Sequence, residues 1–190
     1  MSNAANFLYK AKLKLSMNKN NTPNDIEQVI TDDQILVTKT DVKGNITYAN
    51  ADFLKISGYQ ESEILGQQHN IVRHPDMPRV IFKFLWETIG NKREFNGYIK
   101  NLAKNGSYYW SFANITPTFS YDDEHQLLGY NLVCHKPNPD SLNYIQNLYI
   151  ELLEIEKNSD SEDVIDDSRY KLNSVLNGRE KGYDEFILSI

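Results

Sequence analysis

The amino-acid sequence predicts an α+β domain, because two strand-like runs come first, short helical segments follow, and three longer strand-like runs complete the pattern. The strand-like runs are rich in β-branched and aromatic residues and are bounded by turn residues. A central run after Pro78 contains no helix breaker and predicts the longest helix of the domain. The expected strands are residues 35–40, 46–49, 94–102, 108–119 and 126–135.

Turn and capping residues mark the ends of these elements. Residues 43–45 (Lys-Gly-Asn) predict a tight turn between the first two strands. Asn50 is expected to cap a short helix that Gly58 ends, and residues 62–66 form another helical turn. The Asn-Gly pair at 105–106 is typical of a hairpin and joins the third strand to the fourth.

Residues 69–79, HNIVRHPDMPR, form the most distinctive loop of the sequence. Its two prolines cannot both lie in a helix interior, because each lacks an N–H and collides with the preceding turn. We expect Asp76 and Pro78 in the first turn of the following helix. Arg73, His74 and Asp76 then lie beside a helix start, which suits a polar or anionic ligand. A surface loop with an ordinary helix cap would account for the same residues.

Composition excludes several classes of protein. At 190 residues and a net charge of -6, the chain is long enough for one domain with appendages, and no nucleic-acid footprint is expected. No apolar run approaches the roughly 18 residues of a membrane span, so we expect no membrane insertion. No signal sequence is recognisable, which predicts a cytoplasmic location. The single cysteine, Cys134, excludes an internal disulfide, and the histidine spacing predicts no metal site.

The chain divides into four predicted segments. Residues 1–16 either carry a cloning scar at Ser2-Asn3-Ala4 or form a native amphipathic helix. The segments are an N-terminal cap or linker at 1–30, the α+β domain at 31–137, a C-terminal helix at 138–157, and an acidic linker with a short helical tail at 158–190.

The C-terminal helix is expected to begin at a Ser141 cap and carries apolar residues on several sides. This surplus suggests contact with the sheet or with a second chain, and hence a homodimer. Residues 158–167 read as a solvated acidic linker. The docking residues expected in the tail are Tyr183, Phe186, Ile187 and Ile190.

The run HNIVRHPDMP at 69–78 resembles the flavin-contacting loop of the PAS domain in aerotaxis (energy-taxis) receptors of the Aer type. The resemblance covers about residues 31–137 and implies the PAS fold, a five-stranded antiparallel sheet with helices over one face, plus flanking helices. That face encloses a ligand pocket. Further matches, in the family's order, are ITYAN at 46–50, SGY at 57–59, GYIKN at 97–101 and KNGSYYW at 104–110.

Two asparagines are expected to face the pocket. Strand alternation groups Asn101 with Phe95 on one strand and Asn114 with Trp110 on the next. A buried amide without a partner costs about 1–3 kcal/mol, and the polar edge of a flavin ring offers suitable partners. Pairing of both amides with the backbone or with each other is the alternative.

The resemblance also implies a set of FAD-binding residues. Those that match positions tied to FAD in the family are Asn50, Arg73, His74, Asp76 and Asn101. Arg73 and His74 would hold the pyrophosphate or the ribose-adenine part, and Asp76 would accept from a sugar hydroxyl or orient Arg73. Asn50 also suits a plain helix cap.

Aromatic residues complete the predicted pocket. Phe82 and Trp86 lie four apart on one helical face and either wall the pocket or belong to the core. Phe95 stands where the family usually has Trp. The loop contains no cysteine for a photochemical adduct of the LOV type, and Cys134 is expected to be a core thiol.

The predicted function is a soluble FAD-binding PAS sensor of redox state or oxygen, not an enzyme, which signals in aerotaxis through a partner chemotaxis transducer. Flavin reduction would change the hydrogen bonds at Asn101 and Asn114 and shift residues 141–157. The last strand would reach the pocket through Asn131 or Val133. The alternatives are a cofactor-free PAS dimerisation or scaffold module, and a heme gas sensor with His69 or His74 as axial ligand.

Overall fold

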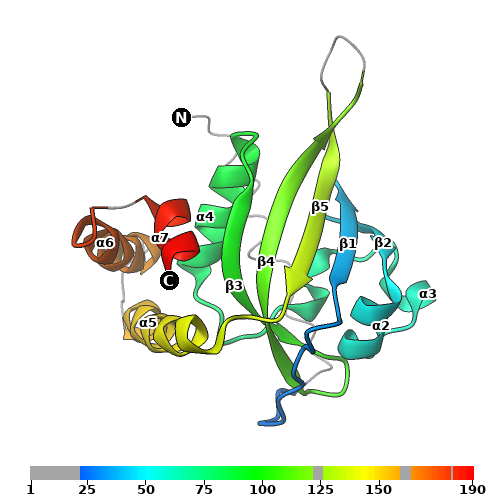
Figure 1. Cartoon of the computed structure of the whole chain (residues 1–190), viewed down its shortest axis with the longest axis horizontal. Helices are drawn as coiled ribbons and strands as arrows, with labels where there is room; N and C mark the ends of the chain where they lie inside the picture. Colours follow the sequence, from blue (N-terminus) through cyan, green and yellow to red (C-terminus); the bar gives the residue numbers. More distant parts are fainter. Residues whose placement is uncertain (1–21, 122–125, 159–163, 181) are drawn as a thin grey trace.

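Five antiparallel strands form one sheet in the order β2-β1-β5-β4-β3, so the predicted α+β fold is confirmed (Figure 1). The computed structural model describes residues 22–121, 126–158, 164–180 and 182–190, so the alternatives for residues 1–16 lie outside the described residues. The strands are β1 (Leu36–Asp41), β2 (Ile46–Ala49), β3 (Phe95–Leu102), β4 (Tyr108–Phe119) and β5 (Leu127–His135).

Short helices connect the two halves of the sheet. Asn50 caps α2 (Ala51–Ser57), and Gly58 ends it with a φ of 73°, a left-handed conformation that glycine adopts without strain. The helices that follow are α3 (Glu61–Ile64), the 3-10 helix η1 (His69–Val72) and α4 (Arg79–Gly90).

The start of α4 differs from the prediction. Pro78 is the N-cap and the helix begins at Arg79, so Asp76 lies before the first turn. The carboxylate at this helix start comes instead from Glu156, far along the sequence, which accepts the N–H groups of Arg79 and Val80 at 2.8 and 3.0 Å. A tertiary contact of this kind leaves no local signal in the sequence.

Strand register corrects the expected position of Asn114. Asn101 lies opposite Tyr109 and Asn114 lies opposite Asn96, so Asn101 and Asn114 are on opposite faces of the sheet. The two strands do alternate as expected, but the register across their turn sets which faces coincide.

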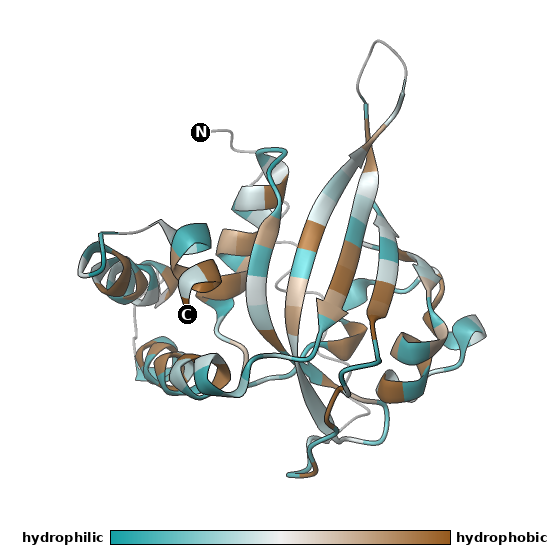
Figure 2. Ribbon diagram, in the orientation of Figure 1, coloured by the Kyte–Doolittle hydropathy of each residue, from teal (hydrophilic) through white to brown (hydrophobic). Residues whose placement is uncertain are grey.

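The same correction applies to the last strand. Leu132 lies opposite Thr38 and the pair Leu36 and Cys134 shares that face, whereas Asn131 and Val133 point to the other face. Hydrophobic and polar residues occur together on the strands, as expected for a sheet covered over part of its surface (Figure 2).

Three helices gather beside the β3 edge of the sheet (Figure 1). They are α5 (Pro139–Asn158), α6 (Val164–Asn177) and α7 (Tyr183–Ser189). Residues 164–167, expected in the linker, are helical, whereas 159–163 lie outside the described residues.

The expected Ser141 cap of α5 is wrong. The helix begins at Pro139, and the Asn138 side chain accepts the N–H groups of Asp140 and Ser141 at 2.9 and 3.1 Å. Proline suits the first helical position because its missing N–H would have no partner there.

The apolar residues of α5 are largely used within the chain. Ile145, Leu148 and Leu152 are buried in one cluster that also contains residues of α6 and α7. Tyr149 donates a hydrogen bond to the carbonyl of Tyr98 at 3.0 Å and so attaches α5 to β3. The protein's own helices and sheet edge therefore cover most of the apolar residues that suggested a second chain, while Tyr144 and Ile150 stay exposed. Of the expected docking residues of the tail, Tyr183, Phe186 and Ile187 are buried and Ile190 is partly buried.

Candidate ligand-binding site

A cavity lies between α4, the η1 segment and one face of the sheet. Its empty volume is about 1070 Å³, which includes open space at its mouth. The lining residues are Thr40, Gly44, Gln68, His69, Asn70, Val72, Arg73, Phe82, Leu85, Trp86, Ile89, Ile99, Asn101, Ser111, Ala113, Ile115, Tyr130, Leu132 and Cys134.

Helix α4 supplies the apolar wall. Phe82, Leu85, Trp86 and Ile89 line the cavity from positions three and four apart, which lie on one side of an α-helix. The Trp86 ring packs edge-on against Tyr130 of β5, with ring centres 6.0 Å apart. Phe82 and Trp86 thus wall the cavity and also contact the core.

Arg73 gives the cavity its charge. It is the lining residue among those described that is ionised at neutral pH, since the other polar ones are amides, hydroxyls, a thiol and the neutral His69. Its guanidinium lies 4.0 Å from the centre of the Phe82 ring, and its backbone pairs with that of Asn101. The cation is thus held against an aromatic face and beside β3. This side of the cavity suits an anionic group.

The sheet contributes a polar pair to the cavity. The Asn101 amide donates to the Ser111 hydroxyl at 3.2 Å and more weakly to the Ile99 carbonyl at 3.4 Å. Ser111 comes from the neighbouring strand and also lines the cavity. Alternation along β4 alone does not predict Ser111 as a lining residue, because the register between β3 and β4 decides which residues of β4 share a face with Asn101. Burial raises the pKa of the nearby Cys134 to about 12, so this residue remains a thiol.

His69 lies in the wall as a neutral side chain. Its Nε2 is 2.8 Å from the Thr38 hydroxyl, and burial lowers its pKa to about 4. The ring also lies 5.9 Å from that of Phe53 in α2. His69 therefore contributes a hydrogen-bonding ring without charge at neutral pH.

His74 and Asp76 form a separate cluster outside the cavity wall. The Asp76 carboxylate lies 2.9 Å from the Lys100 ammonium and 3.5 Å from His74 Nδ1. Although burial opposes it, the hydrogen bond from Lys100 lowers the pKa of Asp76. The Asp76 N–H donates to His74 Nδ1, and burial, followed by the charge of Lys100, lowers the pKa of His74 to about 4. The cluster braces the loop that positions Arg73.

Asn50 is placed as a structural cap. Its side-chain oxygen accepts from the N–H groups of Val37 and Phe53, both at 3.0 Å, and its amide donates to the Ile35 carbonyl at 2.7 Å. These bonds join β1 to the start of α2. Asn50 lies outside the described lining of the cavity.

Phe95 and Asn114 also lie outside that lining. The Phe95 ring stacks on Tyr183 of α7 at 5.6 Å, and Tyr183 stacks in turn on Phe84 of α4 at 5.2 Å. The Asn114 amide donates to the Asn96 side chain at 2.9 Å on the far face of the sheet. The structure thus brings together Arg73, Phe82, Trp86 and Asn101 from the predicted set.

Within the described ranges, no helix combines the length and apolar character needed to cross a membrane. In the same ranges, no three side chains of His, Cys, Asp or Glu converge in a way that would hold a metal ion.

Comparison with known proteins finds a matching family model and relatives with similar sequences. Residues 46–131 match the family model described as PAS fold. The chain is 37% identical over 120 residues to the aerotaxis receptor of Escherichia coli K12, covering 63% of this chain and 23% of that protein. It is 30% identical to the nitrogen fixation regulatory protein of Klebsiella pneumoniae, covering 47% and 18%. The chain therefore spans less than a quarter of the length of these two relatives.

Solved structures agree at the level of the fold. A light-oxygen-voltage domain studied with a flavin analogue superposes with a TM-score of 0.51 at 22% identity, covering 62% of this chain and 87% of that one. The light state of the Aureochrome1 LOV photoreceptor gives a TM-score of 0.51 at 19% identity, covering 66% and 94%. The five-stranded sheet and the helices over its cavity face therefore have the architecture of the PAS fold, and residues 46–131 match its family model.

Proposed function

We propose that this protein is a flavin-binding PAS sensor, which holds FAD in the α4–sheet cavity and passes a redox or oxygen signal to a chemotaxis transducer. One observation carries the proposal. A single cavity presents an arginine at one part of its wall, an amide–hydroxyl pair at another, and aromatic and aliphatic side chains over most of the rest. This combination matches a molecule with a flat apolar ring system, a polar ring edge and a phosphate group.

The donor set fits the parts of FAD. Phe82, Trp86 and the aliphatic residues of the sheet would enclose the ring. Asn101 and Ser111 offer both donors and acceptors to its polar edge, and Arg73 offers a cation to a phosphate. Bound flavin supplies a centre that is reversibly oxidised and reduced, and the neutral His69 and the Cys134 thiol add no competing charge.

Asn50, His74, Asp76, Phe95 and Asn114 have indirect roles in this proposal. They hold the strands, helices and loop around the cavity in place, so that their loss would change flavin binding through the shape of the wall. Direct contact with an extended adenosine part stays a prediction for His74 and Asp76.

The relatives support the sensing role. One is named an aerotaxis receptor, and a fold neighbour was studied with a flavin analogue. A transducer as partner is proposed by similarity to the aerotaxis receptor, whose length this chain covers only in part. A homodimer stays a prediction, since α5 packs on α6, α7 and β3 but leaves Tyr144 and Ile150 exposed.

The alternatives have less support from the site. A heme iron would need a histidine nitrogen, but His69 Nε2 contacts Thr38, and His74 lies outside the described cavity lining. A module that only dimerises or scaffolds would not need an arginine and an amide–hydroxyl pair in one cavity.

The chromophore tests the proposal. We expect the purified protein to be yellow, with flavin absorption, and to release FAD on denaturation, identified by chromatography. Release of FMN would correct the nucleotide, a Soret band would favour heme, and a colourless protein that takes up no added FAD would refute the proposal.

A further inference from the structure

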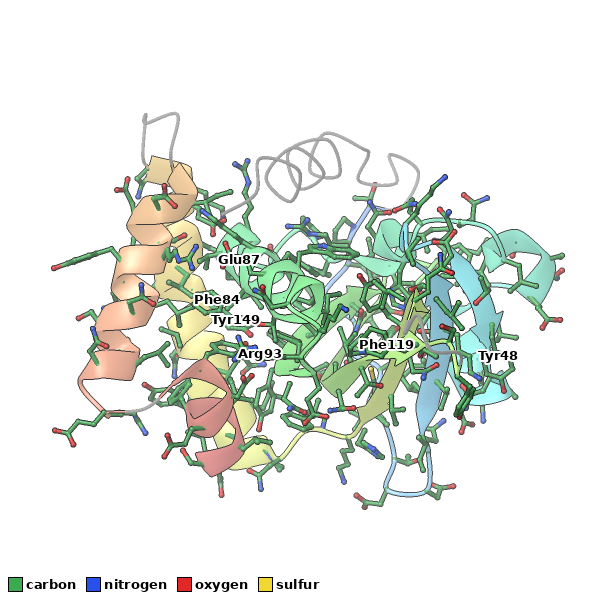
Figure 3. The ribbon with its side chains drawn as sticks, turned by 90° about the horizontal axis from the view of Figure 1, so that it is seen from above. Tyr48, Phe84, Glu87, Arg93, Phe119 and Tyr149 are labelled. Atoms are coloured by element: carbon green, nitrogen blue, oxygen red, sulfur yellow. The ribbon has the colours of Figure 1, made fainter. Side chains whose placement is uncertain are left out.

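Helix α4 makes contacts on two nearly opposite faces, one towards the cavity and one towards the C-terminal helices. Phe82, Leu85, Trp86 and Ile89 line the cavity. With 100° between successive residues, Lys83, Phe84 and Glu87 project from a side about 150–160° away. Figure 3 shows Phe84 and Glu87 between α4 and the helices α5 and α6. A displacement of α4 would therefore change the contacts at both faces.

The second face is attached to α6 by polar contacts. The Arg169 guanidinium makes two hydrogen bonds to the Glu87 carboxylate, both 2.9 Å, and lies 5.2 Å from the centre of the Phe84 ring. Lys83 pairs with Asp166 at 2.7 Å. A two-point arginine–carboxylate pair fixes orientation as well as distance, whereas a single lysine contact to the exposed Asp166 adds little.

The start of α4 is attached to α5 by Glu156. Both oxygens of this carboxylate are used, because each accepts one of the free N–H groups at Arg79 and Val80. The buried Ser168 hydroxyl of α6 donates to the same carboxylate at 3.1 Å. A negative charge at a helix N-terminus is favourable, and this one belongs to a different helix from the one it caps. Glu156 thus joins α4, α5 and α6 at one point.

We infer that α5 and α6 clamp α4 through Glu156 and Arg169, so that ligand binding in the cavity and docking of the C-terminal helices are energetically coupled. The inference rests on the proposed function for its ligand. The cap lies close to the cavity, since Phe82 is the third residue after Arg79 and packs under Arg73. Coupling between two sites is reciprocal, so a change at the clamp alters ligand affinity and ligand binding alters the clamp.

The test uses the full chain and FAD. Glu156→Ala removes the cap, and Glu156→Gln keeps a side-chain oxygen. Glu151→Ala is the matched control, because Glu151 also lies on α5 but pairs with Lys171 of α6 at 2.8 Å. We expect Glu156→Ala to weaken FAD affinity about five-fold or more, Glu156→Gln to recover part of the loss, and Glu151→Ala to stay within about two-fold of the wild type. FAD should slow hydrogen exchange in α5 and α6 of the wild type, and less so in Glu156→Ala.

A second measurement separates this inference from the proposed function. Without ligand, Glu156→Ala should raise hydrogen exchange across residues 79–86 by about ten-fold over the Glu151→Ala control. If the wild type binds no FAD but exchange rises, the clamp stands and the proposed function fails. If Glu156→Ala and Glu151→Ala bind FAD with equal affinity and show the same hydrogen exchange across residues 79–86, the coupling is refuted. A Glu156→Ala protein that does not fold leaves Glu156→Gln to decide by the same two readouts.

Discussion

At the scale of single residues, the cavity separates side chains that face a ligand from those that hold the framework. Arg73 and Asn101 line the cavity wall, whereas the side-chain hydrogen bonds of Asn50 connect β1 and the residue before it to the start of α2. The sequence motif contains both kinds of residue, since a binding loop needs residues that stabilise its conformation as well as residues that contact the ligand. A match to the motif therefore locates the site, but it does not show which of the matching residues contact the ligand.

Arg73 is expected to contribute most of the charge-dependent affinity for FAD. Arg73→Ala should weaken FAD binding about 10- to 100-fold, because a hydrogen bond to a charged group is worth about 1.5–3 kcal/mol. Arg93→Ala, at an exposed position after α4, is the control and should bind like the wild type. Titration of the apoprotein by fluorescence gives both affinities. Equal affinities for the two variants would remove Arg73 from the site.

His69 gives the protein a predictable response to acid. Its pKa is about 4 in the folded protein and near 6.5 when unfolded, so the unfolded state binds the proton first as the pH falls. Stability is therefore fully present above pH 6.5 and is lost towards pH 4, by at most about 1.4 kcal/mol per pH unit from this group. Denaturation of His69→Gln across this range should show a smaller slope than the wild type. An identical slope would mean that His69 does not titrate in this way.

At the scale of elements, local signals predicted the strands and helices well, and tertiary relations were missed. The strand bounds differ from those expected by at most one residue, since turns such as Asn105-Gly106 are encoded locally. The face of Asn114 depended on register across that turn, and the cap of α4 came from Glu156. Neither is contained in the periodicity of a single segment. Ser111 was missed for the same reason.

Substitution of Gly129 by alanine tests the close approach of β1 and β5. A Cβ at this position would lie 2.0 Å from the backbone oxygen of Thr40, so Gly129→Ala must push the strands apart. We expect a loss of about 1–3 kcal/mol or more in the free energy of unfolding, as for overpacking elsewhere. Gly90→Ala is the control, because a Cβ at the end of α4 would meet nothing within 4 Å. Urea denaturation that finds the two variants equally stable would contradict the register described for these strands.

At the scale of the whole molecule, the C-terminal helices share one hydrophobic core with the sheet. Leu172, Leu176 and Phe186 belong to the same buried cluster as residues of β3 and α4. Tyr183 connects the two parts directly, since its ring lies between those of Phe84 and Phe95. The apolar residues of the tail, which the sequence predicted to dock, determine this packing.

Tyr183 is therefore expected to stabilise the entire chain. Tyr183→Ala should lower the free energy of unfolding by about 3–5 kcal/mol, as expected for removal of a buried aromatic side chain. Tyr170→Ala is the matched control, because Tyr170 on α6 is 80% exposed and its loss should cost no more than about 0.5 kcal/mol. Near-ultraviolet circular dichroism should show one transition in each protein. Equal stability of the two variants would mean that α7 does not dock as described.

The central claim is that FAD occupies the cavity between α4 and the sheet. Ile115 lines this cavity, and its neighbour Thr116, which is buried to a similar degree, points to the far face of the same strand. The most direct test is a calorimetric titration of FAD into the apo forms of the wild type, Ile115→Trp and Thr116→Trp. We predict that the wild type and Thr116→Trp bind FAD alike, while Ile115→Trp, whose indole fills the cavity, loses at least about 1.4 kcal/mol, a ten-fold change. A wild type that does not bind FAD, or a folded Ile115→Trp that binds it as tightly as Thr116→Trp, would contradict the claim.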